Sequence, residues 1–478
     1  MSRFNTKDKT LGVNRTKTVN RAGGEAFKQS DKLALISQLL TSFVNDQFYR
    51  SADQGVSDLM YLLGKVDPKF AAKAALFARN EFGMRSVTHL VAANIAETVK
   101  GEEWTKSFFS KIIHRPDDML EILSLVQKPV PNSVKKGFAN VLSTYNEYTL
   151  GKYQGKTKDV SLVDAVNLCH PKATSALSKL MKGDLKAPET WEVGLTQAGQ
   201  NAKNEDEKIT AKAEVWRNLL ENEKLGTFAL LRNLRNIMVQ APDCIDMACK
   251  QLVNAEKIAK SLVLPFRFAT AYKEIGNVVN ISATIQNKVL RAIEKALEVS
   301  SVANVPRFEG ETLVVLDVSR SMRGKSVEIG SLFSVILAKS NDADFMTFDG
   351  DARNKSIDPN SGFLTCQRKI IDQVNGGSTN FHSIFLKANK KYDRIIILSD
   401  MQGWVGYNRP AAEFNAYKRK YNANPYIYSF DLDGYGDMQF PENQVYCITG
   451  FSDKIFDLMK VLEQDRNALI KTIEKVEI

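Results

Sequence analysis

Residues 312–321 read Thr-Leu-Val-Val-Leu-Asp317-Val-Ser319-Arg-Ser321, and this stretch decides the fold of the last part of the chain. The apolar run predicts a buried strand, which ends in one carboxylate and two hydroxyls spaced two residues apart. A helical pattern over 326–340 follows, so the stretch predicts strand, loop and helix. Alternate loop residues can point the same way, and oxygen donors with few charges suit Mg²⁺ or Mn²⁺. We therefore expect a divalent metal site at the end of this strand. An ordinary Asp/Ser loop that caps the helix is the alternative.

Two later stretches supply further oxygen donors. Gly376-Gly-Ser-Thr379 is a loop whose glycines allow Thr379 to approach the site, and residues 394–400 form a second apolar strand that ends in Asp400. This order of Asp-x-Ser-x-Ser, Thr and Asp resembles the metal-ion-dependent adhesion site of the von Willebrand factor A fold. The resemblance implies that the metal is held by Asp317, Ser319, Ser321 and Thr379, and that Asp400 acts mostly through water.

The composition is that of a soluble globular protein with two to four domains. The chain has 478 residues, of which 44% are hydrophobic and 25% are charged. Its five cysteines form no C-x-x-C pair, which fits a reducing cytosol, so we expect a cytoplasmic protein. No apolar run approaches the length of a membrane span, and residues 1–27 lack the apolar core of a signal peptide. We expect no membrane partner.

The net charge of +10 is unevenly distributed. Residues 308–478 carry 21 Lys and Arg against 23 Asp and Glu, whereas the preceding residues carry 44 against 32. The first part is therefore the cationic one, and nucleic acid is its expected partner. Residues 1–28 form a basic arm, for which a mobile tail is favoured over an arm that lies along RNA or a neighbouring domain.

Residues 30–299 show helical periodicity almost throughout, and residues 308–478 alternate strands with helices. The first pattern predicts a HEAT-type helical solenoid, although no clean repeat period is visible. The second predicts a doubly wound, mostly parallel sheet. The expected helices of the first part are 32–40, 56–64, 68–82, 86–99, 104–113, 117–126, 132–148, 162–168, 175–181, 190–198, 211–221, 224–239, 243–252 and 281–299.

Four stretches of the helical part resemble the signature sequences of the TROVE module. They are Phe48–Asp53, Ala78–His89, Thr227–Arg235 and Leu264–Phe266. In the Ro autoantigen family this helical-repeat ring precedes a von Willebrand A domain. The resemblance implies a ring over 29–307 and a Rossmann-like A domain over 308–478, in a monomeric protein. It also implies a binding protein without chemistry of its own, which holds small non-coding Y RNA on the outside of the ring and single-stranded ends of misfolded RNA in its central hole, and so serves RNA quality control.

Three cationic segments fall within one window of about forty residues and favour RNA binding. They follow Pro131, Gly151 and Cys169, and the RNA contacts expected from them are Lys135, Lys136, Lys152, Lys156, Lys158, His170 and Lys172. For any single one of these side chains, an ordinary solvated surface position is equally expected.

Four arginines are further candidates, because guanidinium suits both phosphate contact and base stacking. They are Arg85, Arg232, Arg235 and Arg267, and a buried ion pair is the alternative for each. Two rival functions remain open. One is a helical scaffold whose A domain grips the carboxylate of a protein partner through the metal; the other is a metal-dependent nuclease, which needs more carboxylates around the metal.

Overall fold

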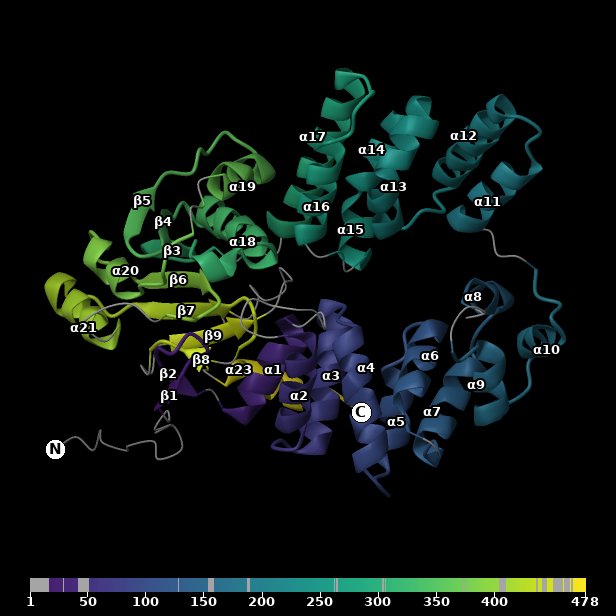
Figure 1. The fold of residues 1–478 in the computed structure, drawn as a ribbon, viewed down its shortest axis with the longest axis horizontal. Helices are drawn as coiled ribbons and strands as arrows, with labels where there is room; N and C mark the ends of the chain where they lie inside the picture. Colours follow the sequence, from purple (N-terminus) through teal and green to yellow (C-terminus); the bar gives the residue numbers. More distant parts are fainter. Residues whose placement is uncertain are drawn as a thin grey trace.

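The computed structural model describes residues 17–28, 30–41, 51–127, 129–153, 159–186, 190–261, 263, 265–302, 305, 307–372, 374, 376–403, 410–435, 437–440, 445–449, 459, 465 and 467–478. Within these residues, helices fill the first two thirds of the chain and a sheet with helices fills the last third (Figure 1). No described helix combines the length and the apolar character that crossing a membrane requires.

The helical part forms two rows (Figure 1). The first row contains α1 (Asp31–Thr41), α2 (Ala52–Leu63), α3 (Pro68–Phe82), α4 (Ser86–Thr98), α5 (Trp104–Lys111), α6 (Pro116–Leu125), α7 (Asn132–Leu142), α8 (Glu147–Lys152), α9 (Leu162–Cys169) and α10 (Ser175–Lys182). The second contains α11 (Trp191–Asn201), α12 (Glu205–Glu221), α13 (Thr227–Gln240), α14 (Ile245–Leu252), α15 (Ala255–Ser261), α16 (Pro265–Gly276) and α17 (Ala283–Val302).

Local sequence signals explain where these helices begin and end. Asp67 accepts a hydrogen bond from Phe70 N (2.8 Å) and caps α3, Pro68 opens the helix, and Gly83 ends it with φ 64°. The helix expected over 132–148 is two helices instead. Its pattern breaks because Asn146 accepts a hydrogen bond from Thr149 N (2.8 Å) and so caps a new helix, α8.

The sheet has six strands in the order β5-β4-β3-β6-β7-β9. They are β3 (Thr312–Asp317), β4 (Asp344–Phe348), β5 (Ala352–Lys355), β6 (Arg394–Ser399), β7 (Tyr426–Asp431) and β9 (Val445–Thr449), and only the edge strand β5 is antiparallel to its neighbour. The sequence pattern over 452–462 also predicts a helix; this stretch lies outside the described residues, apart from Met459, which is helical.

Helices cover both faces of this sheet, which makes it doubly wound. On one face α18 (Lys325–Asn341) and α19 (Phe363–Ile371) share a core with Val314 and Leu316 of β3. On the other face α20 (His382–Lys387) and α21 (Pro410–Tyr421) share a second core with Leu313 and Val315. The alternation of β3 side chains between two cores explains its fully buried, uniformly apolar sequence. These strands and helices are called the sheet domain below.

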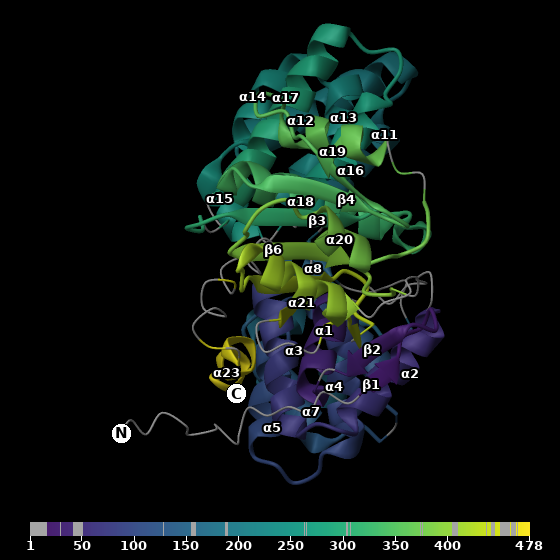
Figure 2. The same ribbon diagram turned by 90° about the vertical axis from the view of Figure 1, so that its left-hand side faces the viewer.

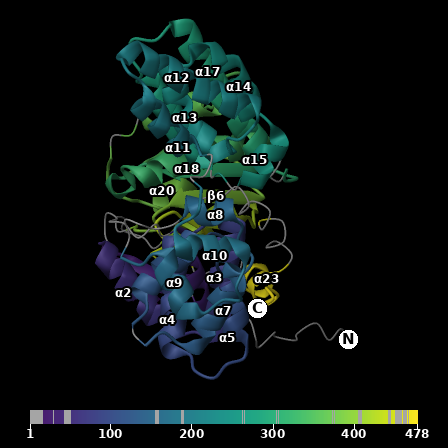
Figure 3. The same ribbon diagram turned by 90° about the vertical axis from the view of Figure 1, so that its right-hand side faces the viewer.

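The sheet domain lies between the two helical rows (Figure 2), and the rows and the sheet domain are arranged as a ring (Figure 1). The sheet domain meets the second row where Glu294 of α17 accepts a hydrogen bond from Leu364 N (2.8 Å). The first row is held by the C-terminal helix α23 (Ala468–Glu474), whose Glu474 pairs with Lys32 (2.6 Å). At the far end of the rows, seen in Figure 3, lie α10 and α11, which follow each other in the chain.

The expectation of a mobile tail at the N-terminus is wrong for residues 17–28. These residues form a hairpin of β1 (Lys17–Val19) and β2 (Glu25–Lys28), and β2 pairs with β8 (Asp437–Met438) at the sheet domain. Asn20 at its turn donates to Gly403 O (2.7 Å). Strands this short have no stability of their own, so the partner strand, distant in sequence, decides the structure. The expected domain boundaries after residues 28 and 307 stay a prediction.

Replacing Gly434 with alanine should loosen the contact between the sheet domain and α1. Gly434 has φ 65°, and a Cβ there would overlap Thr41 Oγ1 and lie 3.2 Å from Ser37 O. We expect a loss of about 2–4 kcal/mol in unfolding free energy, from left-handed strain plus overpacking.

Gly183→Ala is the matched control for this change, because Gly183 has φ 77° and nothing within 4 Å of an added Cβ. This variant should lose only the unfolding free energy that left-handed backbone strain costs, about 1–2 kcal/mol. Urea denaturation of both variants measures the difference. Equal losses would mean that α1 does not press against Gly434.

Candidate metal centre and nucleic-acid interface

Four of the five predicted metal ligands lie at the carboxyl ends of the neighbouring strands β3 and β6. Asp317 is the last residue of β3, and Asp400 directly follows β6, with which β3 is paired. Ser319 and Ser321 belong to the loop and short 3₁₀ turn that lead into α18. All of them, with Thr379, are at most 4% exposed. The topology thus brings together oxygen donors that lie far apart in sequence.

Asp317 is held at the centre of this group. Its Oδ1 accepts a hydrogen bond from Ser319 N (2.8 Å), and its Oδ2 accepts one from Ser399 Oγ (2.6 Å). Ser319 Oγ and Ser321 Oγ lie 3.3 Å apart. Ser399 was not among the predicted residues, although its position just before Asp400 is a signal that sequence reasoning could have used.

The segment that carries Thr379 is hydrogen-bonded through its backbone to the loop after β3 and to Asp349. Arg320 N donates to Gly377 O (3.0 Å), and Asn380 N donates to Asp349 O (2.9 Å). Thr379 itself is 2% exposed. The prediction that the glycine loop approaches the strand end is confirmed, while a metal contact by Thr379 stays a prediction.

The two buried carboxylates are electrostatically unfavourable without a cation. Burial raises the pKa of Asp317 to about 6, and the charge of Asp349 adds to the rise. Burial also raises the pKa of Asp400, and the charges of Asp317 and Asp433 add to it. The Oδ2 atom of Asp400 is buried and makes no hydrogen bond within the described part of the chain. A divalent cation would supply the missing partner, so this all-oxygen donor set fits Mg²⁺ or Mn²⁺.

No group of three or more His, Cys, Asp and Glu side chains able to hold a metal is present among the residues that the structure describes. The predicted centre has only two carboxylates, so its serine and threonine hydroxyls would have to complete the coordination.

The first cationic region lies on the adjoining helices α7 and α9, and at the end of α8. Lys135 and Lys136 open α7, Lys152 ends α8, and His170 and Lys172 follow α9. All except the half-buried Lys135 are exposed. Ser143 Oγ donates to Lys172 O (3.3 Å), which ties the end of α7 to the segment after α9. Lys156 and Lys158 lie outside the described residues.

Tyr153 adds an aromatic ring to this region. The ring centroid lies 5.5 Å from Lys152 Nζ and 5.8 Å from Arg115 Cζ. The sequence shows the Lys-Tyr neighbours, but Arg115 comes from the distant start of α6 and could not be foreseen.

Arg85 is engaged by carboxylates. Its guanidinium donates to Asp118 (2.8 Å), Asp117 (2.6 Å) and Glu121 (2.8 Å) of α6. This is the ion-pair alternative that the sequence left open. An RNA contact by Arg85 stays a prediction that competes with these three bonds.

Arg232 and Arg267 flank an exposed aromatic ring. Phe228 of α13 is 40% exposed, and its ring centroid lies 5.7 Å from Arg232 Cζ and 5.8 Å from Arg267 Cζ. The Arg267 Cζ also lies 4.8 Å from the centroid of Phe266, and Lys325 Nζ at the start of α18 lies 5.4 Å from it. We call these five residues the aromatic–cation cluster.

Like charges crowd this cluster. Burial lowers the pKa of Arg267, and the charge of Arg232 lowers it further. Burial lowers the pKa of Lys325 to about 8, and Arg267 contributes to the fall. Neither Arg232 nor Arg267 pairs with a carboxylate in the described part of the chain. Arg235, also exposed, lies one turn further along α13. Phe228 was missed by sequence reasoning because an aromatic residue in an apolar helix normally points into the core.

Comparison with known proteins shows which protein family the chain belongs to. The TROVE domain model matches residues 25–183 and 158–325, which is more than half of the chain, so the chain belongs to the TROVE domain family. Telomerase protein component 1 of Rattus norvegicus and of Mus musculus are each 20% identical over 347 residues; the match covers 52% of this chain but only 13% of theirs.

The overall fold is similar to that of a solved Ro protein. The crystal structure of the Deinococcus radiodurans Ro (RSR) protein superposes with a TM-score of 0.58 at 19% sequence identity, over 90% of this chain and 99% of that one. The predicted combination of a helical-repeat ring and a von Willebrand A-type domain is therefore confirmed as the fold of this chain.

Proposed function

We propose that this Ro-family RNA-binding protein has two RNA surfaces and no chemistry of its own. A single-stranded RNA end binds at the aromatic–cation cluster, and a folded small non-coding RNA of the Y type binds along α7 to α9. The observation that carries the proposal is the exposed Phe228 ring between two arginines that have no carboxylate partner among the described residues. Such a protein would take part in RNA quality control in the cytoplasm.

The aromatic–cation cluster suits a single strand for physical reasons. An unpaired base can stack on the exposed face of Phe228, which a base inside a duplex cannot do. The guanidinium groups of Arg232 and Arg267 then contact the flanking phosphates or extend the stack. Because the cations repel one another in the absence of RNA, a bound phosphate relieves that repulsion.

The surface of α7 to α9 suits a folded RNA instead. Its lysines and His170 are spread over three helix ends and can follow a phosphate backbone without reading bases. The proposal includes Lys156 and Lys158, which belong to the same stretch of sequence. Contacts of this kind weaken steeply with salt.

We further propose that Asp317, Ser319, Ser321, Thr379 and Asp400 hold Mg²⁺ or Mn²⁺. The Oδ2 atom of the buried Asp400, which has no hydrogen-bond partner among the residues that the structure describes, supports this. A metal bound there would offer a coordination position to the carboxylate of an acidic protein partner. This chain would orient that partner through the loop that follows β3.

The two RNA surfaces can be separated by mutation. Phe228→Ala combined with Arg232→Gln and Arg267→Gln should weaken a short single strand about 10–100-fold, since one stacked base contributes ~1–3 kcal/mol. Lys135→Ala with Lys136→Ala should weaken folded Y-type RNA more than the single strand. Each lost phosphate contact should lower the salt slope by about one. Fluorescence anisotropy at several salt concentrations measures both RNAs.

Lys208→Gln with Arg217→Gln is the matched control, because it removes two cations of α12 that are already paired with Glu205 and Glu214. It should leave both RNAs bound. If the Phe228/Arg232/Arg267 variant and the Lys135/Lys136 variant each weaken the single strand and the folded RNA to the same extent, the two RNAs share one surface and the proposal is wrong.

A further inference from the structure

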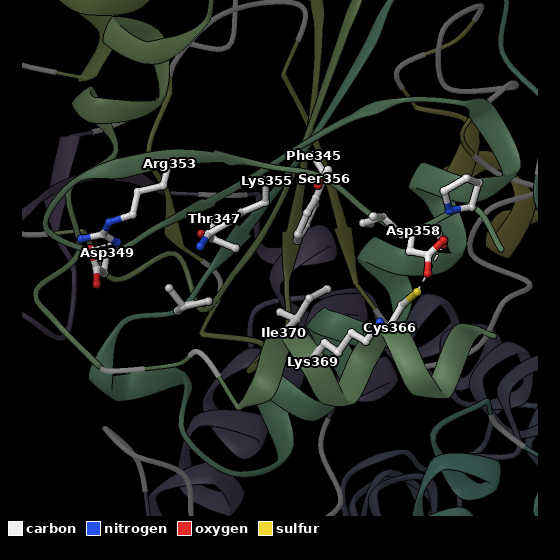
Figure 4. A pocket seen from close by; sticks show the side chains of 13 residues that line it. Phe345, Thr347, Asp349, Arg353, Lys355, Ser356, Asp358, Cys366, Lys369 and Ile370 are labelled. Carbon is white, nitrogen blue, oxygen red and sulfur yellow. Dashed lines mark hydrogen bonds and ion pairs between the residues drawn. The ribbon is translucent and has the colours of Figure 1, made fainter. Parts of the chain in front are cut away.

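The groove between α11 and α12 is separate from the sites described above. It lies at the end of the second helical row (Figure 1) and has a volume of about 1130 Å³. Among the described residues, no predicted metal ligand or RNA contact lines it. The cavity of the sheet domain shown in Figure 4, by contrast, is lined by Val318, which directly follows Asp317, and by Asp349, so it adjoins the metal centre.

The floor of the groove is formed by small and apolar side chains of both helices. On each helix the floor positions are four residues apart and therefore share one face. They are Gly194, Ala198 and Ala202 at α11, and Ala211, Val215 and Leu219 of α12. Helix α11 buries none of its own residues. Because the side chains of α11 that face α12 are so small, the space between the two helices stays open.

The rim of the groove is acidic. The lining contains three carboxylates and one ammonium group, those of Asp206, Glu207, Glu214 and Lys224. Glu214 pairs with Arg217 of the same helix. Glu207 accepts a hydrogen bond from Lys203 N (2.9 Å), a backbone contact that brings no positive charge. The carboxylate of Asp206 is exposed and has no hydrogen-bond or ion-pair partner in the described part of the chain. The rim therefore keeps a negative potential.

This negative charge lies in a part of the chain that is otherwise basic. Residues 190–224 carry seven Asp and Glu against five Lys and Arg, whereas the other residues of 1–307 carry 25 against 39. The rim repels the phosphates of a nucleic acid, and it repels the identical groove of a second copy of the chain. The charge therefore favours a cationic ligand of another kind.

The dimensions of the groove fit a short helix. Its lining on α11 extends from Thr190 to Ala202, which corresponds to roughly 18 Å of helix. The volume exceeds the range of about 300–1,000 Å³ that is usual for small-molecule sites. An extended peptide would leave its backbone groups without partners on the apolar floor, since the backbone groups of α11 and α12 are bonded within their own helices. A helix satisfies its own backbone and buries one apolar face.

We propose that the groove between α11 and α12 binds an amphipathic helix of a partner protein, one with an apolar face and basic flanks. The apolar face packs on Ala198 and Val215, and the basic flank lies against Asp206 and Glu207. The site is independent of the metal centre and of both RNA surfaces. The protein can therefore hold RNA and this partner at the same time.

Fluorescence anisotropy on the full chain tests the groove with a synthetic peptide of about eighteen residues. Its leucines occupy one helical face and its lysines the other. This peptide should bind at least tenfold more tightly than a scrambled peptide of the same composition, which has no apolar face. Ala198→Trp should weaken the amphipathic peptide at least tenfold, because the indole occupies the groove.

A second variant tests the charges and does not change the shape of the groove. Asp206→Asn with Glu207→Gln should weaken the peptide about three- to tenfold, and the glutamine oxygen can still accept from Lys203 N. Glu192→Gln with Glu221→Gln is the matched control, because it removes two exposed carboxylates of the same two helices that do not line the groove. It should leave peptide binding unchanged.

Three results would overturn the proposal. Equal affinity for the amphipathic and the scrambled peptide would mean unspecific attraction of charge. Undiminished binding by both the Ala198→Trp and the Asp206/Glu207 variants would place the peptide elsewhere. If Ala198→Trp weakened a single-stranded RNA instead of the peptide, the groove would be a nucleic-acid site. Failure of either proposed RNA surface would leave the peptide results untouched.

Discussion

Replacing Asp317 with alanine should abolish binding of Mn²⁺ or Mg²⁺ and leave RNA binding largely intact. Asp317 is fully buried at the end of β3, where its two oxygens accept hydrogen bonds from Ser319 N and Ser399 Oγ. Its loss removes the central charge of a donor set that has only two carboxylates. Calorimetry with Mn²⁺ should show saturable binding for the unmodified chain and none for the variant.

Thermal unfolding with and without Mn²⁺ distinguishes a variant that no longer binds the metal from one that no longer folds. Mn²⁺ at 100 times its Kd should stabilise the unmodified chain by about 2.7 kcal/mol and the Asp317→Ala chain not at all. Asp433→Asn is the control, because Asp433 lies nearby but is bonded to Ser326 Oγ (2.5 Å) and is not a predicted ligand. It should still bind Mn²⁺. Undiminished binding by Asp317→Ala would refute the assignment of the metal site.

Asp118→Ala should be the most destabilising single change in the first helical row. Asp118 is fully buried at the start of α6 and pairs with Arg79 (2.8 Å) and Arg85 (2.8 Å), and it lies 3.2 Å from His89 Nε2. It also accepts from the backbone N of His114 (3.1 Å). Removing it leaves a buried guanidinium without its charge partner, which costs ~3–5 kcal/mol. Urea denaturation measures the loss.

An exposed pair provides the comparison. Asp243 pairs with Arg217 (2.8 Å) at the surface, so Asp243→Ala should change stability far less. If the two variants lose the same free energy, the Asp118 network does not hold α3, α4 and α6 together as its geometry indicates.

The contribution of Asp118 to the free energy of unfolding should also depend on pH and decrease on acidification. Burial alone would raise the pKa of Asp118, but the contact with His89 and the charge of Arg79 outweigh it and hold the pKa well below its usual range. The stability it supplies is therefore complete above the unfolded pKa of about 4 and declines as pH falls below it. The difference between the unmodified chain and Asp118→Asn should be constant from pH 7 to about 5 and shrink below about 4. A difference that grew on acidification would contradict this.

Local patterns were sufficient for much of the fold. Helix α3 begins and ends at the predicted residues because its cap, its proline and its terminal glycine are all local signals. The approach of Asp317 to Asp400 could be predicted because neighbouring parallel strands end at the same edge of a sheet. Helices α15 and α16 were missed, since the short α15 and the following proline leave no continuous periodicity.

Contacts made over long sequence separations could not be predicted. The engagement of Arg85 depends on carboxylates 32 to 36 residues away, and the hairpin of β1 and β2 depends on β8. The exposure of Phe228 likewise depends on how α13 meets α16. Helical periodicity shows which residues share a face, but the partner of that face is set by the packing of the whole ring.

The attachment of α23 to the first helical row has a consequence for biosynthesis. Lys32 and its partner Glu474 are 442 residues apart, and Leu469 and Ile473 of α23 are buried. At about 5–20 residues per second, a ribosome needs roughly 20–90 s between making one and the other. During that interval the nascent first row presents an uncovered surface, and its ring is open. Sealing of this surface therefore cannot precede the synthesis of α23, and a product that stops short of α23 would leave the first row uncovered there.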